Sequence, residues 1–448
     1  METRIAVVGI VVEEEESAEA LNEILHEYRE YIIGRMGIPY RQKGLNIISI
    51  AVDAPLGCDL RPLRQGGQAA GGQLENGLLR GAAMSRALAL ARQLADTHNL
   101  PDGDLLYLLE HRDPEAAELL RSRAQALCQE VYGRRVFIRG LIEFTNFCKN
   151  DCYYCGIRKS NRRAQRYRLS QEDILACCGM GYGLGFRTFV LQGGEDPWFT
   201  DERLCAIVRA IKARWPDCAV TLSVGERSRE SYRLLREAGA DRYLLRHETA
   251  TPSHYQKLHP PELSLAHRMA CLRDLKDLGY QVGAGFMVGS PWQTREDLVR
   301  DLRFLKDFQP HMVGIGPFLS QKDTPFREFP NGSGELTLFL LSVIRLLLPE
   351  VLLPATTALG TLLPGGREQG ILHGANVVMP NLSPQDAREK YTLYDNKLHS
   401  GAEAAESLGL LRESLSKIGY EIPIDKGSGP WPDWTIRAMG RRLRPRLC

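Results

Sequence analysis

The sequence predicts an α/β fold: a parallel (β/α)8 barrel of the TIM type, preceded by a small, partial ferredoxin-like β-α-β module. Two observations predict the barrel. From residue 136 onwards, short apolar, β-branched segments alternate steadily with helical segments. Eight strands with their crossovers fit into about 250 residues, which is the usual length of a complete barrel. A doubly wound sheet is the alternative, but the glycines at 181–185 follow a helix and precede a strand, unlike a dinucleotide-binding loop.

Composition limits the function classes. The chain has 448 residues, with 57 basic and 55 acidic side chains, so no nucleic-acid or acidic-membrane partner is expected. Eleven cysteines without a repeated pattern favour a reducing cytoplasm over a disulfide scaffold. No signal peptide is visible. The most apolar stretch, residues 336–348, contains Ser342 and Arg345 and is predicted to be a buried helix rather than a membrane span.

The N-terminal module is expected at residues 1–55. Residues 3–12 are predicted as a strand, Ser17 as the cap of a helix that continues to about Arg35, and residues 45–52 as a second strand. Half a ferredoxin-like unit leaves a sheet edge open. We therefore expect it to pair with another chain, to pack on the main domain or to be partly disordered, with a dimerisation or vestigial role favoured over a regulatory ligand site.

A Gly/Gln-rich stretch at 56–77 has the composition of a flexible linker. The main domain is expected at 78–448, with the barrel core at about 134–380. Its first part, 78–131, is predicted to be helical, and Asp113 precedes Pro114 as a helix start. The barrel strands are predicted at 136–144, 186–192, 219–225, 242–247, 281–288, 311–316, 351–356 and 375–379. Intervening helices are predicted at 170–180, 200–214, 228–238, 264–278, 294–307 and 335–348.

Three cysteines follow the first barrel strand. Cys148, Cys152 and Cys155 have the spacing C-x3-C-x2-C on a loop. Three thiolates can hold three corners of a cubane iron–sulfur cluster and leave the fourth iron open to a ligand. The alternatives are a structural zinc knuckle or three unrelated buried cysteines. Zinc requires a fourth ligand, and no Cys or His occurs between Gly156 and Leu175.

Other candidate site residues stand at the ends of the following strands, where barrel chemistry gathers. Small residues after the second strand allow a ligand to approach the backbone, and Glu195 there can contact an ammonium group; a plain glycine-rich turn is the alternative. Arg246 and Glu248 place opposite charges side by side after the fourth strand. Arg268, on the next helix, can pair with a carboxylate or can simply be an exposed arginine.

The region from about residue 80 to 440 resembles the HydE-type maturases of [FeFe] hydrogenase, relatives of biotin synthase in the radical S-adenosylmethionine (SAM) superfamily. The stretches that carry the resemblance are Phe144-Thr-Asn-Phe-Cys, Leu191-Gln-Gly-Gly-Glu-Asp-Pro, Tyr243-Leu-Leu-Arg-His-Glu-Thr-Ala, Gly283-Ala-Gly-Phe-Met-Val-Gly, Met312-Val-Gly-Ile-Gly-Pro-Phe, Pro354-Ala-Thr-Thr-Ala-Leu-Gly-Thr, Pro364-Gly-Gly-Arg-Glu and Gly374-Ala-Asn-Val-Val-Met-Pro-Asn.

This resemblance implies one [4Fe-4S] cluster on the cysteines and SAM as cosubstrate, since the additional C-terminal cysteine trio of some members is missing. The residues implied on the SAM side are Gln192, Gly193, Gly194, Glu195, Ser223, Glu248 and Arg268. Those implied to line the substrate cavity are Gln192 again, with Arg246, Met287, Thr356, Thr357, Met379, Tyr391 and Tyr394.

The N-terminal segment is similar to another family of the same system, the small ACT-like iron-only hydrogenase system regulators. The similarity rests on residues 31–40 and 47–55, and it ends after Pro55, where those proteins continue into a further helix and strand.

Together, the resemblances imply reductive cleavage of SAM to methionine and a 5′-deoxyadenosyl radical, which acts on a small iron–carbonyl–cyanide–cysteine precursor of the H-cluster. Arg246 would neutralise an anionic iron complex, and the two threonines would bind its cyanide. The implied partners are an upstream maturase that supplies this organometallic substrate, a downstream scaffold protein and a reductant such as ferredoxin or flavodoxin. The alternatives are a radical SAM enzyme on an organic substrate, such as a methylornithine or biotin synthase, and a non-catalytic metallocluster carrier.

Overall fold

A computed structural model describes residues 3–12, 25–26, 29–40, 45–55, 85–398 and 408–430. The chain divides into two compact units, Met1–Ala89 and Leu90–Cys448. The predicted linker at 56–77 lies outside the described residues.

The first unit contains a three-stranded antiparallel sheet in the order β1-β3-β2. The strands are β1 (Thr3–Val12), β2 (Ile32–Tyr40) and β3 (Leu45–Pro55), so β3 lies in the centre. Along β3, Ile48, Ile50 and Val52 are buried and alternate with less buried residues, which is the period of a strand with one covered face.

The predicted helix through Arg35 is wrong at its C-terminal end. Helical residues are present at 25–26 and a short 3-10 turn, η1, spans Arg29–Tyr31, but residues 32–40 then form β2. The reason is the hairpin with β3, in which Tyr40 pairs with Leu45 and Ile32 with Val52. This pairing satisfies the backbone of β3 along its second edge, which a helix would have left open. The module is therefore more than a β-α-β half-unit.

Six strands of the second unit form a parallel sheet in the order β11-β9-β8-β7-β6-β5. Their bounds are β5 (Gly140–Thr145), β6 (Thr188–Gly193), β7 (Ala219–Ser223), β8 (Arg242–Leu244), β9 (Gln281–Ala284) and β11 (Met312–Val313). A further short parallel pair, β10 (Met287–Val288) and β12 (Gly316–Pro317), extends two of them.

Parallel pairings then close the sheet into a barrel. Met312 bridges Leu352, and Pro354 bridges Val377, so residues around 352–354 act as the seventh strand. The eighth is β13 (Val377–Val378), which pairs with β4 (Phe137–Ile138) just before β5. A last bridge joins Leu141 of β5 to Asn381. The predicted eight-stranded barrel is confirmed, although its seventh strand is reduced to isolated bridges.

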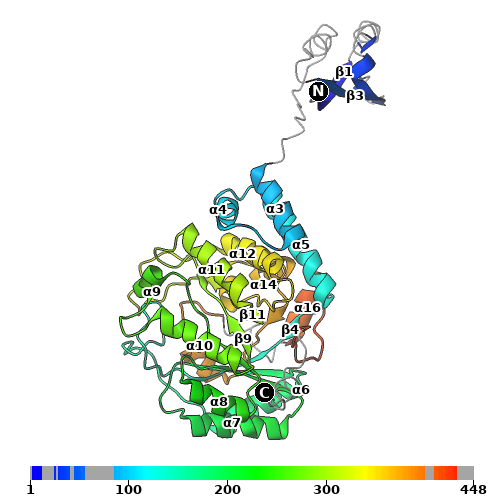
Figure 1. Ribbon diagram of the computed structural model, residues 1–448. Helices are drawn as coiled ribbons and strands as arrows, with labels where there is room; N and C mark the ends of the chain where they lie inside the picture. The colour runs from blue at the N-terminus through cyan, green and yellow to red at the C-terminus, as the bar shows by residue number, and fades with distance from the viewer. Residues whose placement is uncertain are drawn as a thin grey trace, which may run out of the picture. The chain divides into compact units, whose positions relative to one another are not determined.

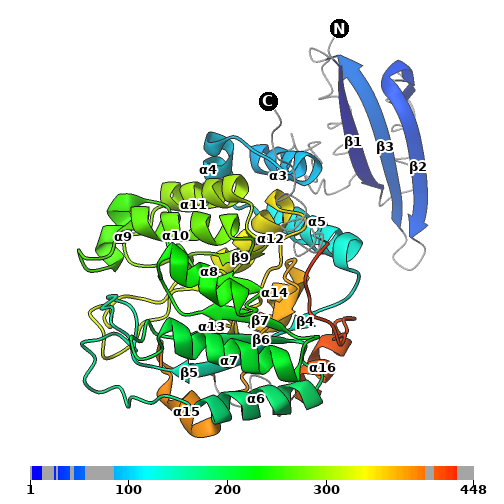
Figure 2. The same cartoon turned by 60° about the horizontal axis from the view of Figure 1, so that its bottom comes forward.

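Helices surround the strands (Figures 1 and 2). The crossover helices are α6 (Gln171–Gly183), α7 (Asp201–Arg214), α8 (Arg229–Glu237), α10 (Leu265–Asp277), α11 (Arg295–Phe308) and α12 (Gly334–Leu347). Side-chain caps begin several of them: Ser170 and Thr294 both form capping boxes with an aspartate three residues later. In the part of the chain that the structure describes, none of the helices is both long and apolar enough to cross a bilayer.

Three helices precede the barrel: α3 (Arg86–Thr97), α4 (Asp102–Glu110) and α5 (Pro114–Tyr132). As predicted, Asp113 caps α5 and Pro114 is its first residue. Five further short helices were not predicted individually. They are α9 (Pro252–Leu258), α13 (Thr357–Leu362), α14 (Gly366–Leu372), α15 (Gln385–Lys390) and α16 (Leu408–Lys417).

Candidate active site

The cysteine loop, residues 146–166, leaves the C-terminal end of β5. Its first residue, Asn146, donates side-chain hydrogen bonds to the carbonyls of Gln165 (2.8 Å) and Lys390 (2.9 Å). The Arg166 guanidinium donates to four carbonyls of the same loop, those of Asn146, Ile157, Arg158 and Asn161. The loop is thus held together by one arginine, and Asn146 joins it to the C-terminal end of α15 (Gln385–Lys390).

Two glycines allow the neighbouring backbone to approach this loop. A Cβ atom on Gly194 would lie 2.2 Å from the carbonyl oxygen of Phe147 and 2.7 Å from Cβ of Cys148. A Cβ atom on Gly156 would lie 1.9 Å from the carbonyl oxygen of Thr392. The loop is therefore held between the end of β6 on one side and the 391–398 segment on the other.

The three thiols share one poorly solvated environment. Burial raises the pKa of Cys148, and it raises the pKa of Cys155 to about 12. Burial first, and then the charges of Cys155 and Cys148, raise the pKa of Cys152 well above its usual value. The Cys148 charge raises the pKa of both other thiols, and the Cys155 charge raises that of Cys152, so the three thiols are near one another. A positively charged metal centre would offset this cost and release the protons.

These donors fit a cubane cluster. Among the described residues, no three His, Cys, Asp or Glu side chains are arranged to hold a single metal ion. In a cubane, each thiolate binds a different iron, so the three sulfurs need not meet at one point. Three thiolates hold three irons of a [4Fe-4S] cluster and leave the fourth for another ligand.

Two acidic residues next to the cysteine loop are already engaged. Glu195 accepts from the backbone N–H of Glu226 (2.9 Å) and forms an ion pair with Lys149 (3.2 Å).

Arg268 donates from Nε to Glu226 (2.5 Å) and from Nη1 to the carbonyl of Arg246 (3.1 Å). Arg268 is buried, so the reading of an exposed helical arginine is wrong. Glu226 was not among the predicted site residues, although its place at a strand end could have marked it.

Arg246 and Glu248 lie together, as their positions in the sequence predicted. Their side chains form an ion pair at 3.1 Å. Arg246 Nε and Glu248 Oε2 are nevertheless buried without a hydrogen-bond partner. Glu248 also has a φ of 66°, a left-handed conformation that is costly for a residue with a side chain. Strain and orphaned polar atoms at one place are typical of a ligand site.

The remaining residues implied on the SAM side are at adjoining strand ends. Gln192 pairs in register with Ser223 of β7. Gly193 pairs with Thr145 of β5, and a Cβ atom there would lie 2.7 Å from the Thr145 side chain. The ends of β5, β6 and β7 thus lie side by side, with Gly194 against the cysteine loop.

The two methionines implied in the cavity belong to different hydrophobic clusters. Met287 is buried in a cluster that Tyr153 and Tyr154 of the cysteine loop pack against. Met379 instead packs against the cluster of Met312 and Leu352. The structure therefore places one beside the cysteines and the other among core residues of the sixth and seventh strands.

The paired threonines begin α13. Thr356 is its N-cap residue and Thr357 its first helical residue. The Thr356 hydroxyl is buried without a hydrogen-bond partner, and a Cβ atom on Gly316 would lie 2.8 Å from it. The hydroxyl is available to a ligand near the end of β12.

Tyr391 and Tyr394 follow α15, and a buried ion pair holds this segment to the barrel. Lys397 pairs with Glu143 of β5, and its ammonium also lies 4.8 Å from the Tyr391 ring centre. Tyr391 is hydrogen-bonded to Gln192, and Tyr394 to Thr361 of α13. Neither Glu143 nor Lys397 was predicted, because no local pattern joins two residues so far apart in the sequence.

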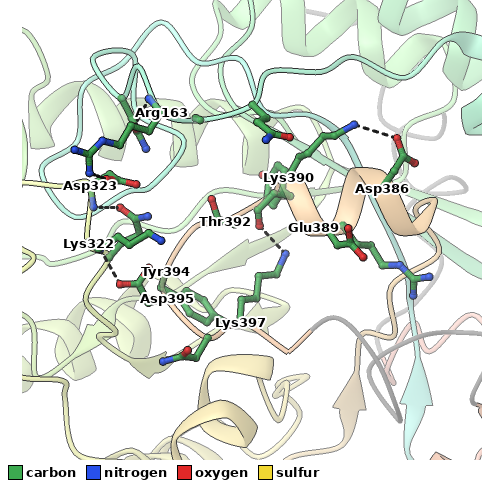
Figure 3. Close-up of a pocket in the computed structure, with 17 residues that line it drawn as sticks. Arg163, Lys322, Asp323, Asp386, Glu389, Lys390, Thr392, Tyr394, Asp395 and Lys397 are labelled. Atoms are coloured by element: carbon green, nitrogen blue, oxygen red, sulfur yellow. Dashed lines mark hydrogen bonds and ion pairs between the residues drawn. The ribbon is translucent and has the colours of Figure 1, made fainter.

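A cavity of about 890 Å³ lies over this segment. Figure 3 shows Arg163, Lys322 and Asp323 on one side of it, with Asp395 beside them, and Asp386, Glu389 and Lys390 on the other. Tyr391 and Tyr394 both line it, so they face a space larger than many small ligands.

Comparisons with known proteins agree with this geometry. Residues 142–305 match the radical SAM superfamily, and residues 4–57 match the iron-only hydrogenase system regulators. The chain is 47% identical to the [FeFe] hydrogenase maturase subunit HydE of Thermotoga maritima over 281 residues, 63% of this chain and 80% of that protein. It is 30% identical to the 3-methylornithine synthase of Methanosarcina acetivorans, covering 68% of this chain and 86% of the relative.

Among solved structures, a methylornithine synthase (PylB) superposes with a TM-score of 0.65 and 28% identity, over 75% of this chain and 97% of that one. Radical SAM enzymes use a [4Fe-4S] cluster and SAM, which the three thiols suit. The extent of the HydE match and the superfamily match lead to one assignment. This chain belongs to the HydE family of [FeFe] hydrogenase maturases and is a radical SAM enzyme.

Proposed function

We propose that this enzyme acts on a small iron–carbonyl–cyanide–cysteine precursor during assembly of the H-cluster of [FeFe] hydrogenase. The observation that carries the proposal is the cysteine trio at the C-terminal end of a closed barrel, the same end of the barrel at which Arg246, Glu248 and the unpartnered Thr356 hydroxyl follow their strands. When bound together, the cluster and SAM supply a 5′-deoxyadenosyl radical by one-electron cleavage of the sulfonium.

The residues of the chain have separate roles in this proposal. Cys148, Cys152 and Cys155 hold the cluster. The SAM carboxylate and ammonium contact Arg246 and Glu248, whose buried nitrogen and oxygen atoms lack hydrogen-bond partners. Other SAM contacts come from Gln192, Gly193, Gly194, Glu195, Ser223 and Arg268.

Substrate contacts are proposed for residues at the C-terminal ends of the barrel strands and for the two tyrosines of the 391–398 segment. Thr356 and Thr357 donate hydrogen bonds to the cyanide ligand, and Arg246 supplies positive charge for an anionic complex. Met287, Met379, Tyr391 and Tyr394 supply an apolar surrounding that keeps water away from a reactive carbon radical. The proposed partners are an upstream maturase that delivers the precursor, a downstream scaffold protein and a ferredoxin or flavodoxin. We place the enzyme in the cytoplasm, where thiols remain reduced.

Cys152→Ser tests the cluster assignment. Reconstituted anaerobically, this variant is expected to lose iron and to form no 5′-deoxyadenosine with SAM and dithionite, because an alcohol is a poor ligand for iron. Electron paramagnetic resonance of the reduced wild-type protein should shift when SAM is added. Undiminished SAM cleavage by the variant would refute the assignment.

A second candidate is a radical SAM enzyme on an organic substrate, favoured by the 30% identity to 3-methylornithine synthase. The rate of 5′-deoxyadenosine formation separates the two. For a maturase it should rise above the substrate-free rate only with the organometallic precursor, and for a methylornithine synthase only with an amino acid. A carrier without catalytic activity would release no 5′-deoxyadenosine with either.

A further inference from the structure

A second hollow, of about 550 Å³, adjoins the cysteine loop. We call it the basic groove. One wall is formed by residues 158–163 of the loop and the other by residues 322–327. Its charged lining residues are Arg158, Arg162, Arg163, Lys322 and Arg327, against a single acidic residue, Asp323.

Three of these five cationic side chains form ion pairs, and two do not. Arg158 pairs with Asp151 at 2.6 Å, and Arg163 pairs with Asp323 at 2.8 Å. Arg327 pairs only with its exposed neighbour Glu328, at 3.1 Å. Arg162 and Lys322 form no ion pair within the described residues, so the groove carries an excess of cationic groups toward solvent.

The groove belongs to the same loop that carries the cysteines. The backbone N–H of Arg158 donates to the carbonyl of Cys155 (3.1 Å), and that of Lys159 donates to the carbonyl of Asn150 (2.8 Å). No helix or strand separates the groove from the cysteine positions. A donor protein seated in it would be near the cluster, which matters because electron transfer between proteins slows steeply with distance.

We propose that the basic groove is the docking surface for an acidic protein that carries a one-electron flavin or iron–sulfur centre. This inference rests on the proposed function, since it assumes a cluster on the three cysteines. One electron leaves the donor's centre and enters the cluster, and no proton or group moves with it. Complementary charge favours fast encounter and correct orientation in such transient complexes, which are usually small.

Binding is tested first, independently of turnover. Arg162→Gln/Arg327→Gln removes two charges of the groove that have no role in the candidate active site. Titration calorimetry of the full-length, cluster-loaded protein with flavodoxin should show a dissociation constant about fivefold to tenfold higher than for the wild type. The wild-type constant should rise with salt, and that of the variant should rise less.

The matched control is Arg209→Gln/Arg214→Gln on α7, which likewise removes two exposed arginines; neither forms an ion pair among the described residues, and the pair of Arg327 with Glu328 is solvent-exposed. It should bind flavodoxin like the wild type. Arg162→Lys, which keeps the charge, should also retain binding. Equal affinity of the groove variant and the wild type would overturn the proposal.

Two reductants then separate the docking surface from the cluster assignment. With flavodoxin as donor, the groove variant should need about fivefold to tenfold more donor for half-maximal 5′-deoxyadenosine formation. With dithionite, its rate should equal that of the wild type. Loss of both rates would show that the arginines support the loop itself and would overturn docking. A wild type inactive even with dithionite would refute the proposed function instead.

Discussion

At the scale of single residues, the cysteine loop depends on the absence of a side chain at Gly194. A methyl group there would overlap the Phe147 carbonyl, at 2.2 Å, and crowd Cys148. Gly194→Ala should therefore displace the loop and lower the iron content after anaerobic reconstitution to well below half of the wild-type value. Iron and sulfide analysis measures this.

Gly103→Ala on α4 is the matched control, because a Cβ atom there meets nothing within 4 Å. It should leave the iron content unchanged and raise the free energy of unfolding by about 0.5–1 kcal/mol, as alanine does in a helix. Full iron content in Gly194→Ala would contradict the close packing of β6 against the loop.

At the scale of an element, the segment after α15 is fastened by the ion pair between Lys397 and Glu143. Glu143 is fully buried, and it also accepts from the Asn381 side chain (2.8 Å). Lys397→Met should leave this carboxylate without its cation and lower the free energy of unfolding by about 3 kcal/mol or more. The same change should weaken substrate turnover, since Tyr391 lies under the lysine.

Lys390→Met is the control for this element. Lys390 pairs with Asp386 on the exposed side of α15 at 3.2 Å, so its loss should cost no more than about 0.5 kcal/mol. Urea denaturation under anaerobic conditions compares the two variants. Equal stabilities would refute a structural role for the buried pair.

At the scale of the whole molecule, buried histidines make stability depend on pH. Burial lowers the pKa of His259 to about 3 and that of His311 to about 4. In the unfolded chain both titrate near pH 6.5, so below that pH the unfolded state binds more protons than the folded state. The free energy of unfolding should fall by about 1 kcal/mol per pH unit for each histidine between pH 6 and 4.5.

Chemical denaturation at several pH values measures this slope. Above pH 7.5 these two residues should contribute no slope. His311→Gln should make the free energy of unfolding depend less steeply on pH, because one titrating histidine is lost. A variant slope identical to that of the wild type would show that His311 is protonated in the folded state.

A second prediction at this scale concerns the two units. Every residue of the candidate active site lies in Leu90–Cys448. A chain of residues 78–448 should therefore bind the same iron and cleave SAM with dithionite at the wild-type rate. A loss of iron binding on truncation would show that the N-terminal unit supports the site.

The sequence by itself determined the barrel and the cysteine trio. Alternating strand and helix periods are local properties, and parallel strands bring their C-terminal ends to one face, so the proximity of Arg246 and Glu248 can be predicted from the sequence. The same local reading failed for residues 32–35, because their strand is stabilised by the hairpin with β3 and not by their own pattern.

Only the tertiary structure decided which distant groups neutralise one another. Glu226 forms an ion pair with Arg268, and Glu143 forms one with Lys397, which is far from it in the sequence. Arg166, likewise, donates hydrogen bonds to four carbonyls of the cysteine loop. Sequence spacing carries information on periodicity within an element. The pairing of buried charges depends on how separate elements pack, because a buried charge is stable only where the fold brings it a partner.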